Sequence, residues 1–230
     1  DGSDIPKQGS ASVGVKRQWC GQLGKKANCQ AGVFLGYSSS AGYTLLDKRL
    51  YLPAEWFTTD YAEQRYKCHV PTTLTFQTKN ELAWSMIAAC AEADTLAARW
   101  LTMDEAFGKD SQLLARIDDE TDYYYFAEVP KDTQLWLTEP ETYLPEPSGR
   151  GRPATKRRLA PTAPVAQTVE AIATQLATAA WQTHALRQGT KGFLIAQVAA
   201  IRVYPARAGL PGTQCWLILR RNPDDPTDIH

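Results

Sequence analysis

The alternation of apolar and polar residues predicts a loop and then a β-hairpin at the start of the chain. Residues 1–29 are rich in glycine, lysine and other polar residues, which is typical of a loop. Apolar residues dominate 29–37 and 43–52, and turn-forming residues fill 38–42 between them. Two such runs separated by a short turn predict a pair of hairpin strands.

The next segments carry first a helical and then a strand pattern. Apolar residues over 78–93 recur at helical spacing, and Thr78 is a suitable N-cap, so we expect a helix there. The apolar run 98–103 predicts a short strand that ends at Asp104.

A second helix and an aromatic strand complete the predicted core. Asp110 can cap a helix whose buried face would include Leu113 and Ile117. The run 122–129 then predicts the strand. This order of elements is typical of a mixed α/β layer, and it fits an RNase H-like fold whose first strand lies just before Asp1.

Composition changes in the second half of the chain. Prolines and glycines make 140–160 a linker or mobile loop. An amphipathic helix is expected from about Pro164, a suitable first helical residue, to Leu186. Two β-rich runs, 192–204 and 215–219, predict another hairpin.

These patterns divide the chain into three parts. We expect an RNase H-like core over 1–130, an insertion over 131–221 and a turn-rich end over 222–230. Neither end resembles a natural domain border, which indicates a fragment. The expected fold class is α/β, a mixed sheet with helices on its faces and a large β-rich insertion.

The overall charge is balanced, but it does not exclude a nucleic-acid partner. The chain has 25 Lys and Arg and 25 Asp and Glu, and local charge distribution matters more than this sum. No apolar run approaches the roughly 20 residues of a membrane helix, so no membrane partner is expected. The five cysteines form no C-x-x-C pair, which favours free thiols in a reducing cytosol over a zinc site.

Two aspartates are candidate metal ligands. Asp104 closes a predicted strand, and Asp1 would sit at the C-terminal end of another. If these strands are neighbours, both carboxylates project from one sheet edge, where hard oxygen ligands suit Mg²⁺ or Mn²⁺. A strand-terminal aspartate is more commonly a turn former or a helix cap, so spacing alone leaves both roles open.

Several longer stretches resemble one family of DNA-processing enzymes. They are DGSDIPKQG over 1–9, SVGVKRQWCG over 12–21, DKRLYLPAEW over 47–56, WLTMDEAFG over 100–108 and FAEVP over 126–130. In this order they resemble the DDE domain of insertion-sequence 701-like bacterial transposases, in the IS-four-like superfamily. The resemblance covers essentially the whole chain.

The resemblance implies that Asp1 is the first catalytic acid and Asp104 the second, and that both bind metal. Asp4 is the rival for the first role, although we expect it in the loop beyond the strand end. Glu105 is a weaker rival to Asp104, because neighbouring side chains at an extended strand end point in opposite directions.

The third acid of the family is a glutamate on a helix after the β-rich insertion. This sequence has no Glu after Glu170, which is expected on the amphipathic helix inside the insertion. Asp224, Asp225 and Asp228 lie in a Pro-rich turn, where we expect them to face solvent. The chain is therefore expected to stop short of the catalytic helix.

Two basic stretches are candidate DNA contacts. The first, close to Asp1 in sequence, comprises Lys7, Lys16, Arg17, Lys25 and Lys26. The second, in the Pro/Gly-rich loop, comprises Arg150, Arg152, Lys156, Arg157 and Arg158. Such residues either neutralise phosphates, which makes binding salt-dependent, or form a solvated surface. Trp19 is either a core residue or a side chain that stacks on an exposed base.

The resemblance implies an enzyme of the bacterial cytoplasm that cuts and rejoins double-stranded DNA at transposon ends. Water and then a 3′-hydroxyl would attack phosphodiesters with the help of two Mg²⁺ or Mn²⁺ ions. The partners would be terminal inverted repeats, target DNA and further copies of the protein on DNA. Two alternatives stay open: an inactive remnant that still binds DNA, and a metal-dependent hydrolase that does not act on DNA.

Overall fold

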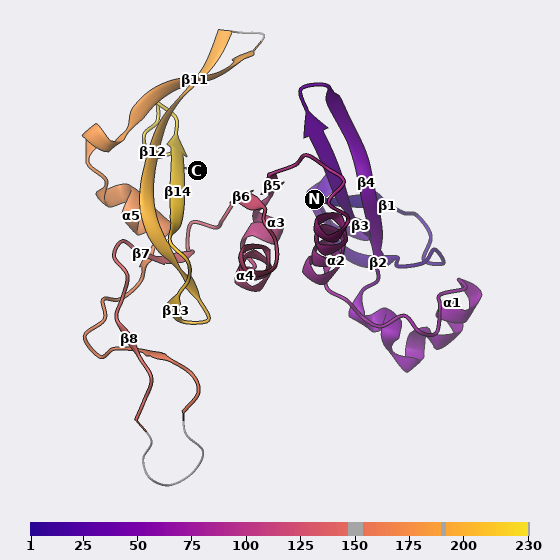
Figure 1. The fold of residues 1–230 in the computed structure, drawn as a ribbon. Helices are drawn as coiled ribbons and strands as arrows, with labels where there is room; N and C mark the ends of the chain where they lie inside the picture. Colours follow the sequence, from indigo (N-terminus) through magenta and orange to yellow (C-terminus); the bar gives the residue numbers. More distant parts are fainter. Residues whose placement is uncertain (147–153, 190–191, 230) are drawn as a thin grey trace. The chain divides into compact units, whose positions relative to one another are not determined.

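The computed structural model describes residues 1–146, 154–189 and 192–229, which form two compact units (Figure 1). The first unit spans Asp1–Glu128 and the second Val129–His230. Both contain strands and helices, so the fold is mixed α/β. In the described part of the chain, no helix is long and apolar enough to span a membrane.

One long strand, β3 (Lys25–Ser39), organises the first unit. β1 (Gly2–Pro6) lies antiparallel along one edge of β3. β2 (Lys16–Cys20) and β4 (Gly42–Tyr51) lie antiparallel along the other edge. The pair of β3 and β4 confirms the predicted hairpin.

The prediction of a loop over 1–29 is wrong, because β1, β2 and the start of β3 lie there. Every second residue in the middle of β3 faces the core, and Cys29, Ala31 and Val33 are all 0% exposed. β1 and β2 form hydrogen bonds with the edges of this buried strand. Their glycine and lysine content alone would favour a loop. Tertiary pairing therefore outweighs local composition.

Helix α2 (Lys79–Ala93) packs on β3 and β4 and supplies much of the core (Figure 1). Its side chains Leu82 and Met86 are buried, as predicted. Thr78 Oγ1 accepts a hydrogen bond from Glu81 N, and the Glu81 carboxylate accepts one from Thr78 N. This capping box satisfies two N–H groups at the helix start and confirms Thr78 as the N-cap.

Short helical segments connect the strands and α2. Trp56 is fully buried in one of them, and its Nε1 donates a hydrogen bond to Val15 O at 3.1 Å. These segments are η1 (Gly21–Leu23), η2 (Ala54–Phe57), η3 (Thr59–Tyr61) and α1 (Ala62–Lys67).

β5 (Trp100–Met103) and β6 (Tyr124–Ala127) form a separate parallel pair. Two helices, α3 (Glu105–Gly108) and α4 (Ser111–Glu120), connect them, which confirms the predicted order strand, helix, strand. The expected single mixed sheet is not formed, because within the described residues β5 pairs with β6 alone.

Asp110 caps α4, as predicted. Its Oδ1 accepts hydrogen bonds from Gln112 N at 2.9 Å and Leu113 N at 3.1 Å. Its Oδ2 accepts a hydrogen bond from the Asn80 side chain, which ties α4 to α2. Leu113 and Ile117 are buried on the inner face of the helix.

A six-stranded sheet around β12 (Gly192–Arg207) dominates the second unit. β11 (Gln182–Gly189) and β14 (Cys215–Arg221) pair antiparallel with β12. The pair of β12 and β14 confirms the predicted second hairpin. The short strands of this unit are β7 (Gln134–Trp136), β8 (Thr142–Tyr143), β9 (Arg158–Leu159), β10 (Gln167–Thr168) and β13 (Leu210–Pro211).

The helix predicted over 164–186 is wrong for most of its length. Only α5 (Val169–Gln175) is α-helical, and η4 (Thr178–Ala180) and β11 follow it. Val169 and Ile172 of α5 are buried in the core of the unit. Residues from Gln182 onward pair with the edge of β12 as β11, so tertiary pairing overrides the local helical pattern.

Replacing Asp110 with alanine should lower the free energy of unfolding by about 1–2 kcal/mol, because two N–H groups of α4 lose their acceptor. Urea denaturation followed by circular dichroism measures the loss. The matched control is Asp119→Ala, an exposed acid near the end of the same helix, which should change stability by less than about 0.5 kcal/mol. Equal losses in both variants would contradict the capping role.

Candidate active site

Asp104 lies at the junction of β5 and α3. It is half-buried, and its Oδ1 accepts a hydrogen bond from Ala106 N at 3.1 Å, so it caps α3. Its carbonyl oxygen accepts a hydrogen bond from Gly108 N at 2.8 Å. No hydrogen bond from the described residues reaches Oδ2, which leaves this oxygen to a ligand.

Two residues of α3 fix the position of Asp104. A Cβ on Gly108 would lie 2.0 Å from Glu128 O, so only glycine fits this contact with the backbone that leaves β6. Phe107 is 3% exposed and anchors the same turn in the core. Sequence reasoning missed both roles, and the available signal was the Phe-Gly pair within one turn of the aspartate.

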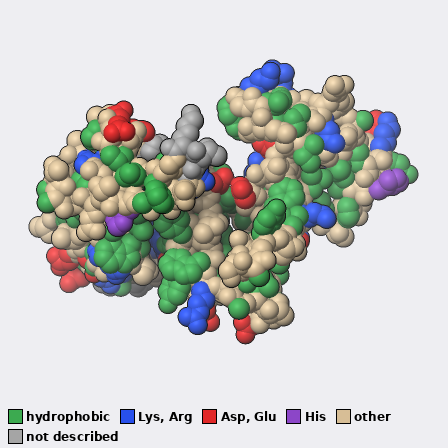
Figure 2. Space-filling view, turned by 90° about the horizontal axis from the view of Figure 1, so that it is seen from above, with side chains coloured by type: hydrophobic (Ala, Val, Ile, Leu, Met, Phe, Trp, Pro, Cys, Tyr) green, Lys and Arg blue, Asp and Glu red, His purple; other side chains and the backbone are tan. Residues whose placement is uncertain are grey.

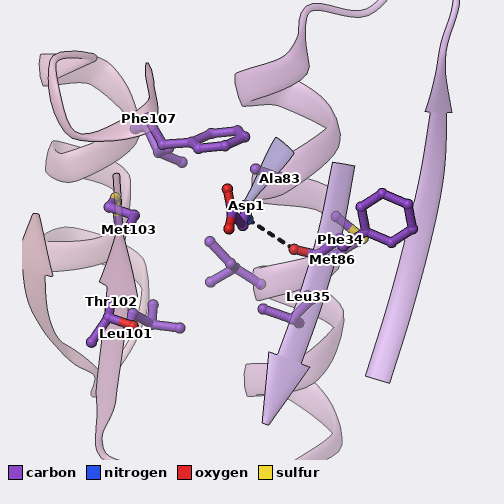
Figure 3. Close-up of a pocket in the computed structure, with 11 residues that line it drawn as sticks. Asp1, Phe34, Leu35, Ala83, Met86, Leu101, Thr102, Met103 and Phe107 are labelled. Carbon is purple, nitrogen blue, oxygen red and sulfur yellow. Dashed lines mark hydrogen bonds between the residues drawn. The ribbon is translucent and has the colours of Figure 1, made fainter. Parts of the chain in front are cut away.

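Asp1 begins the ladder between β1 and β3. Its amino group donates a hydrogen bond to Phe34 O at 2.9 Å, and Phe34 N donates one to Asp1 O at 2.8 Å (Figure 3). Asp1 directly precedes β1 and extends its pairing with β3, and the expectation that it also closes an earlier strand stays a prediction. The residue is exposed.

Asp1 lines a small apolar pocket, partly open to solvent, between β3 and β5 (Figure 3). Leu35, Met86, Leu101 and Phe107 are among the other lining side chains. Met103, the residue directly before Asp104, also lines this pocket. Asp1 thus lines the pocket itself, whereas Asp104 follows one of its lining residues.

The Asp104 carboxylate acts electrostatically on the α-amino group of Asp1. Burial lowers the pKa of this α-amino group below its ordinary value. The Asp104 carboxylate opposes that effect, because a nearby negative charge stabilises the protonated amine and raises the pKa. The structure thus brings Asp1 and Asp104 within electrostatic reach of each other.

The pocket separates two open strand edges. β1 pairs with β3 only as far as Val33, and the contact of Asp1 with Phe34 adds one further rung. Beyond Phe34, no described strand pairs with this edge of β3, and β5 leaves its outer edge open as well. Figure 3 shows β3 and β5 running in opposite directions across the pocket.

The two rival acids occupy different positions. Asp4 lies within β1 rather than in the expected loop, because the ladder with β3 continues through it. Its Oδ2 accepts a hydrogen bond from Gly21 N at 2.7 Å, and its Oδ1 lies 3.9 Å from Lys79 Nζ. Asp4 is therefore engaged within the fold. Glu105 is exposed in the first turn of α3.

The remaining acids of interest lie in the second unit. Glu170 is exposed in the first turn of α5. Asp224, Asp225 and Asp228 are exposed, as expected, and hydrogen bonds from Thr227 lower the pKa of Asp225. Among the described residues, no three His, Cys, Asp or Glu side chains gather into a metal-binding group.

The first basic stretch is divided between an ion pair and an exposed hairpin. Lys16 forms a salt bridge with Glu55. Arg17, Lys25 and Lys26 are exposed on β2 and β3. Lys7 follows β1 and is half-buried, and its backbone N–H donates to Asn28 O.

The second basic stretch is described only in part. Arg150 and Arg152 lie outside the described residues. Arg157 donates hydrogen bonds to Thr142 Oγ1 at 2.9 Å and to Thr142 O at 2.6 Å, whereas Lys156 and Arg158 are exposed. On the face seen in Figure 2, Lys and Arg side chains form small separate groups, with hydrophobic and acidic groups between them.

The fold is mixed α/β, and Asp104 lies at a strand end within electrostatic reach of Asp1. A family model described as DDE superfamily endonuclease matches residues 1–193, which include both Asp1 and Asp104. The chain belongs to this family. No curated protein and no solved structure matches the chain.

Replacing Gly108 with alanine should lower the free energy of unfolding by about 1–3 kcal/mol, because the new Cβ forces α3 away from Glu128. Thermal and urea denaturation measure the loss. Gly9→Ala is the matched control, since nothing lies within 4 Å of its added Cβ. A Gly108 variant as stable as the Gly9 variant would disprove the close contact.

Proposed function

We propose that the chain is the catalytic domain of an insertion-sequence 701-like DDE transposase of the bacterial cytoplasm. The enzyme would cut and rejoin double-stranded DNA at terminal inverted repeats, join it to target DNA, and associate with itself on the DNA. The observation that carries this proposal is that Asp104, at the end of β5, lies within electrostatic reach of Asp1 in a chain of the DDE superfamily endonucleases.

Asp1 and Asp104 would hold the divalent cations. Their carboxylate oxygens are hard ligands that suit Mg²⁺ or Mn²⁺, and Oδ2 of Asp104 is not used in capping α3. Two such cations, when bound, activate the attacking oxygen and stabilise the leaving oxygen of a phosphodiester. A further carboxylate, on a helix after the insertion, would complete this site.

The open edges beside the pocket support an RNase H-like sheet for the first unit. A strand that continued the ladder of Asp1 and Phe34 would run antiparallel to β3 and parallel to β5. It would fill the pocket and join β3 and β5 into one sheet. Asp1 would then end a strand beside β5, and Asp104 would end β5, at the same sheet edge.

Exposed cations of both basic stretches would contact DNA phosphates. Arg17, Lys25 and Lys26 are candidates in the first unit, and Lys156 and Arg158 in the second. Neutralising phosphates releases counterions, so the affinity for DNA should fall as salt rises.

Replacing Asp104 with asparagine should weaken Mn²⁺ binding to the full chain at least tenfold, because a charged oxygen ligand is lost. Asparagine still caps a helix well, so α3 should remain folded. Asp1→Asn should have the same effect, and calorimetric titration with Mn²⁺ measures both. Glu105→Gln and Asp4→Asn are the controls and should bind Mn²⁺ like the original chain.

The Mn²⁺ titration, combined with measurements of DNA binding and DNA nicking, distinguishes an active transposase from the two alternative functions. Unchanged Mn²⁺ affinity in both the Asp1 and Asp104 variants would remove the metal site. Salt-dependent DNA binding without Mg²⁺-dependent nicking would identify an inactive remnant. Mn²⁺ binding without any affinity for duplex DNA would identify a hydrolase of another substrate.

Extending the chain before Asp1 by five alternating valine and threonine residues should raise the midpoint of thermal unfolding by about 5 °C, because a strand enters the pocket. Hydrogen exchange should slow in β5 and in β3 beyond Phe34. An extension of five alternating glycine and serine residues is the matched control. Equal midpoints and exchange rates for the two extensions would contradict a strand at this position.

A further inference from the structure

One face of the β2–β3 hairpin combines an exposed tryptophan with cations. Residues alternate between the two faces of a strand, so Arg17 and Trp19 of β2 point to the same side. Lys26 is directly opposite Trp19 in the ladder, and Asn28 is opposite Arg17. Arg17 and Lys26 are exposed, and Trp19 is 59% exposed. The face therefore presents a large aromatic ring between two positive charges.

The charge of this face is not neutralised locally. Residues 5–46 contain five Lys and Arg residues and no Asp or Glu. Lys16, on the opposite side of β2, is paired with Glu55. Within the described residues, Arg17 and Lys26 form no ion pair. An anionic partner would therefore meet no competing carboxylate on the hairpin.

The backbone beneath Trp19 is fixed. Gly24 turns the chain with a φ of 61°, a conformation that glycine adopts at little cost. On the inner side, Cys20 and Cys29 are both 0% exposed. The Cys29 thiol donates to Trp19 O at 3.8 Å, and Gln18 Nε2 donates to Cys29 O at 3.1 Å. Trp19 is thus held on a rigid support, which lowers the entropy cost of binding a planar partner.

We propose that this hairpin face binds an unpaired nucleic-acid strand by stacking a base on Trp19 and pairing phosphates with Arg17 and Lys26. Stacking requires an accessible ring face, and bases within a duplex do not offer theirs. The two cations supply the sequence-independent attraction to the backbone. The partner is therefore single-stranded DNA or RNA rather than an intact duplex.

The position of the face separates it from the two acids. Lys26 is eight residues before Phe34, the partner of Asp1, which corresponds to about 26 Å along β3 at about 3.3 Å per residue. The face would thus hold an unpaired strand about 26 Å from the end of the ladder that carries Asp1. The biological role of this contact rests on the proposed function, but the contact itself needs no metal.

Fluorescence anisotropy with labelled oligonucleotides, in EDTA, tests the proposal on the full chain. The probes are a 12-nucleotide single strand and a blunt 12-base-pair duplex. Trp19→Ala should weaken binding of the single strand about 5- to 150-fold, as expected for loss of one stacked base. Duplex affinity should change less than twofold, and Trp19→Phe should retain most of the single-strand affinity.

The control is Trp216→Ala, a tryptophan that is 58% exposed on β14 of the second unit. It should leave single-strand affinity unchanged. An equal loss in the Trp216 and Trp19 variants, or no loss in the folded Trp19 variant, would overturn the proposal. EDTA removes divalent cations, so these affinities do not depend on metal binding by Asp1 and Asp104. A failure of the proposed metal site would therefore leave the outcome of this experiment unchanged.

Double replacement of Arg17 and Lys26 by glutamine tests the electrostatic part independently. It should reduce the slope of log affinity against log salt for the single strand by about 1.4, at about 0.7 per neutralised phosphate. An unchanged slope would show that these two cations do not contact phosphates, and the proposed face would be wrong.

Discussion

Hydrogen bonding along both edges of β3 holds the first unit together. β1 occupies one edge, β2 and β4 occupy the other, and the middle of the inner face of β3 is fully buried. Asp1 takes its position from the last rung of this ladder, through two hydrogen bonds to Phe34. Trp19 takes its position from the opposite end, through pairing with Lys26. One strand therefore places both candidate functional surfaces.

The features of the fold that were predicted correctly from the sequence are those whose signal lies within a few consecutive residues. The N-cap Thr78, the cap of Asp110 and the hairpin turn at 38–42 are local features, and the structure confirms each. β1, β2 and β11 were missed for the opposite reason. Their conformation depends on partner strands, and composition alone favoured a loop for the first two and a helix for the third.

The candidate site shows the same division between local and distant causes. Asp104 was correctly placed at a strand end, because the apolar run before it is contiguous. The pairing of Asp1 with Phe34, which is 33 residues away, has no local signal in the sequence. The need for glycine at 108 depends on Glu128 O, a contact that no local pattern reveals.

The separation of opposite charges along β3 has a physical consequence for a phosphodiester enzyme. Cations beside Asp1 and Asp104 would compete with a divalent metal for the carboxylates. Along β3, Lys26 lies about 26 Å from Phe34, and Arg17, opposite Asn28, lies about 20 Å from it, which is about two to three Debye lengths at physiological ionic strength. At that distance solvent screens them from the acids. The hairpin can therefore attract a nucleic-acid backbone without weakening the affinity of the carboxylates for metal.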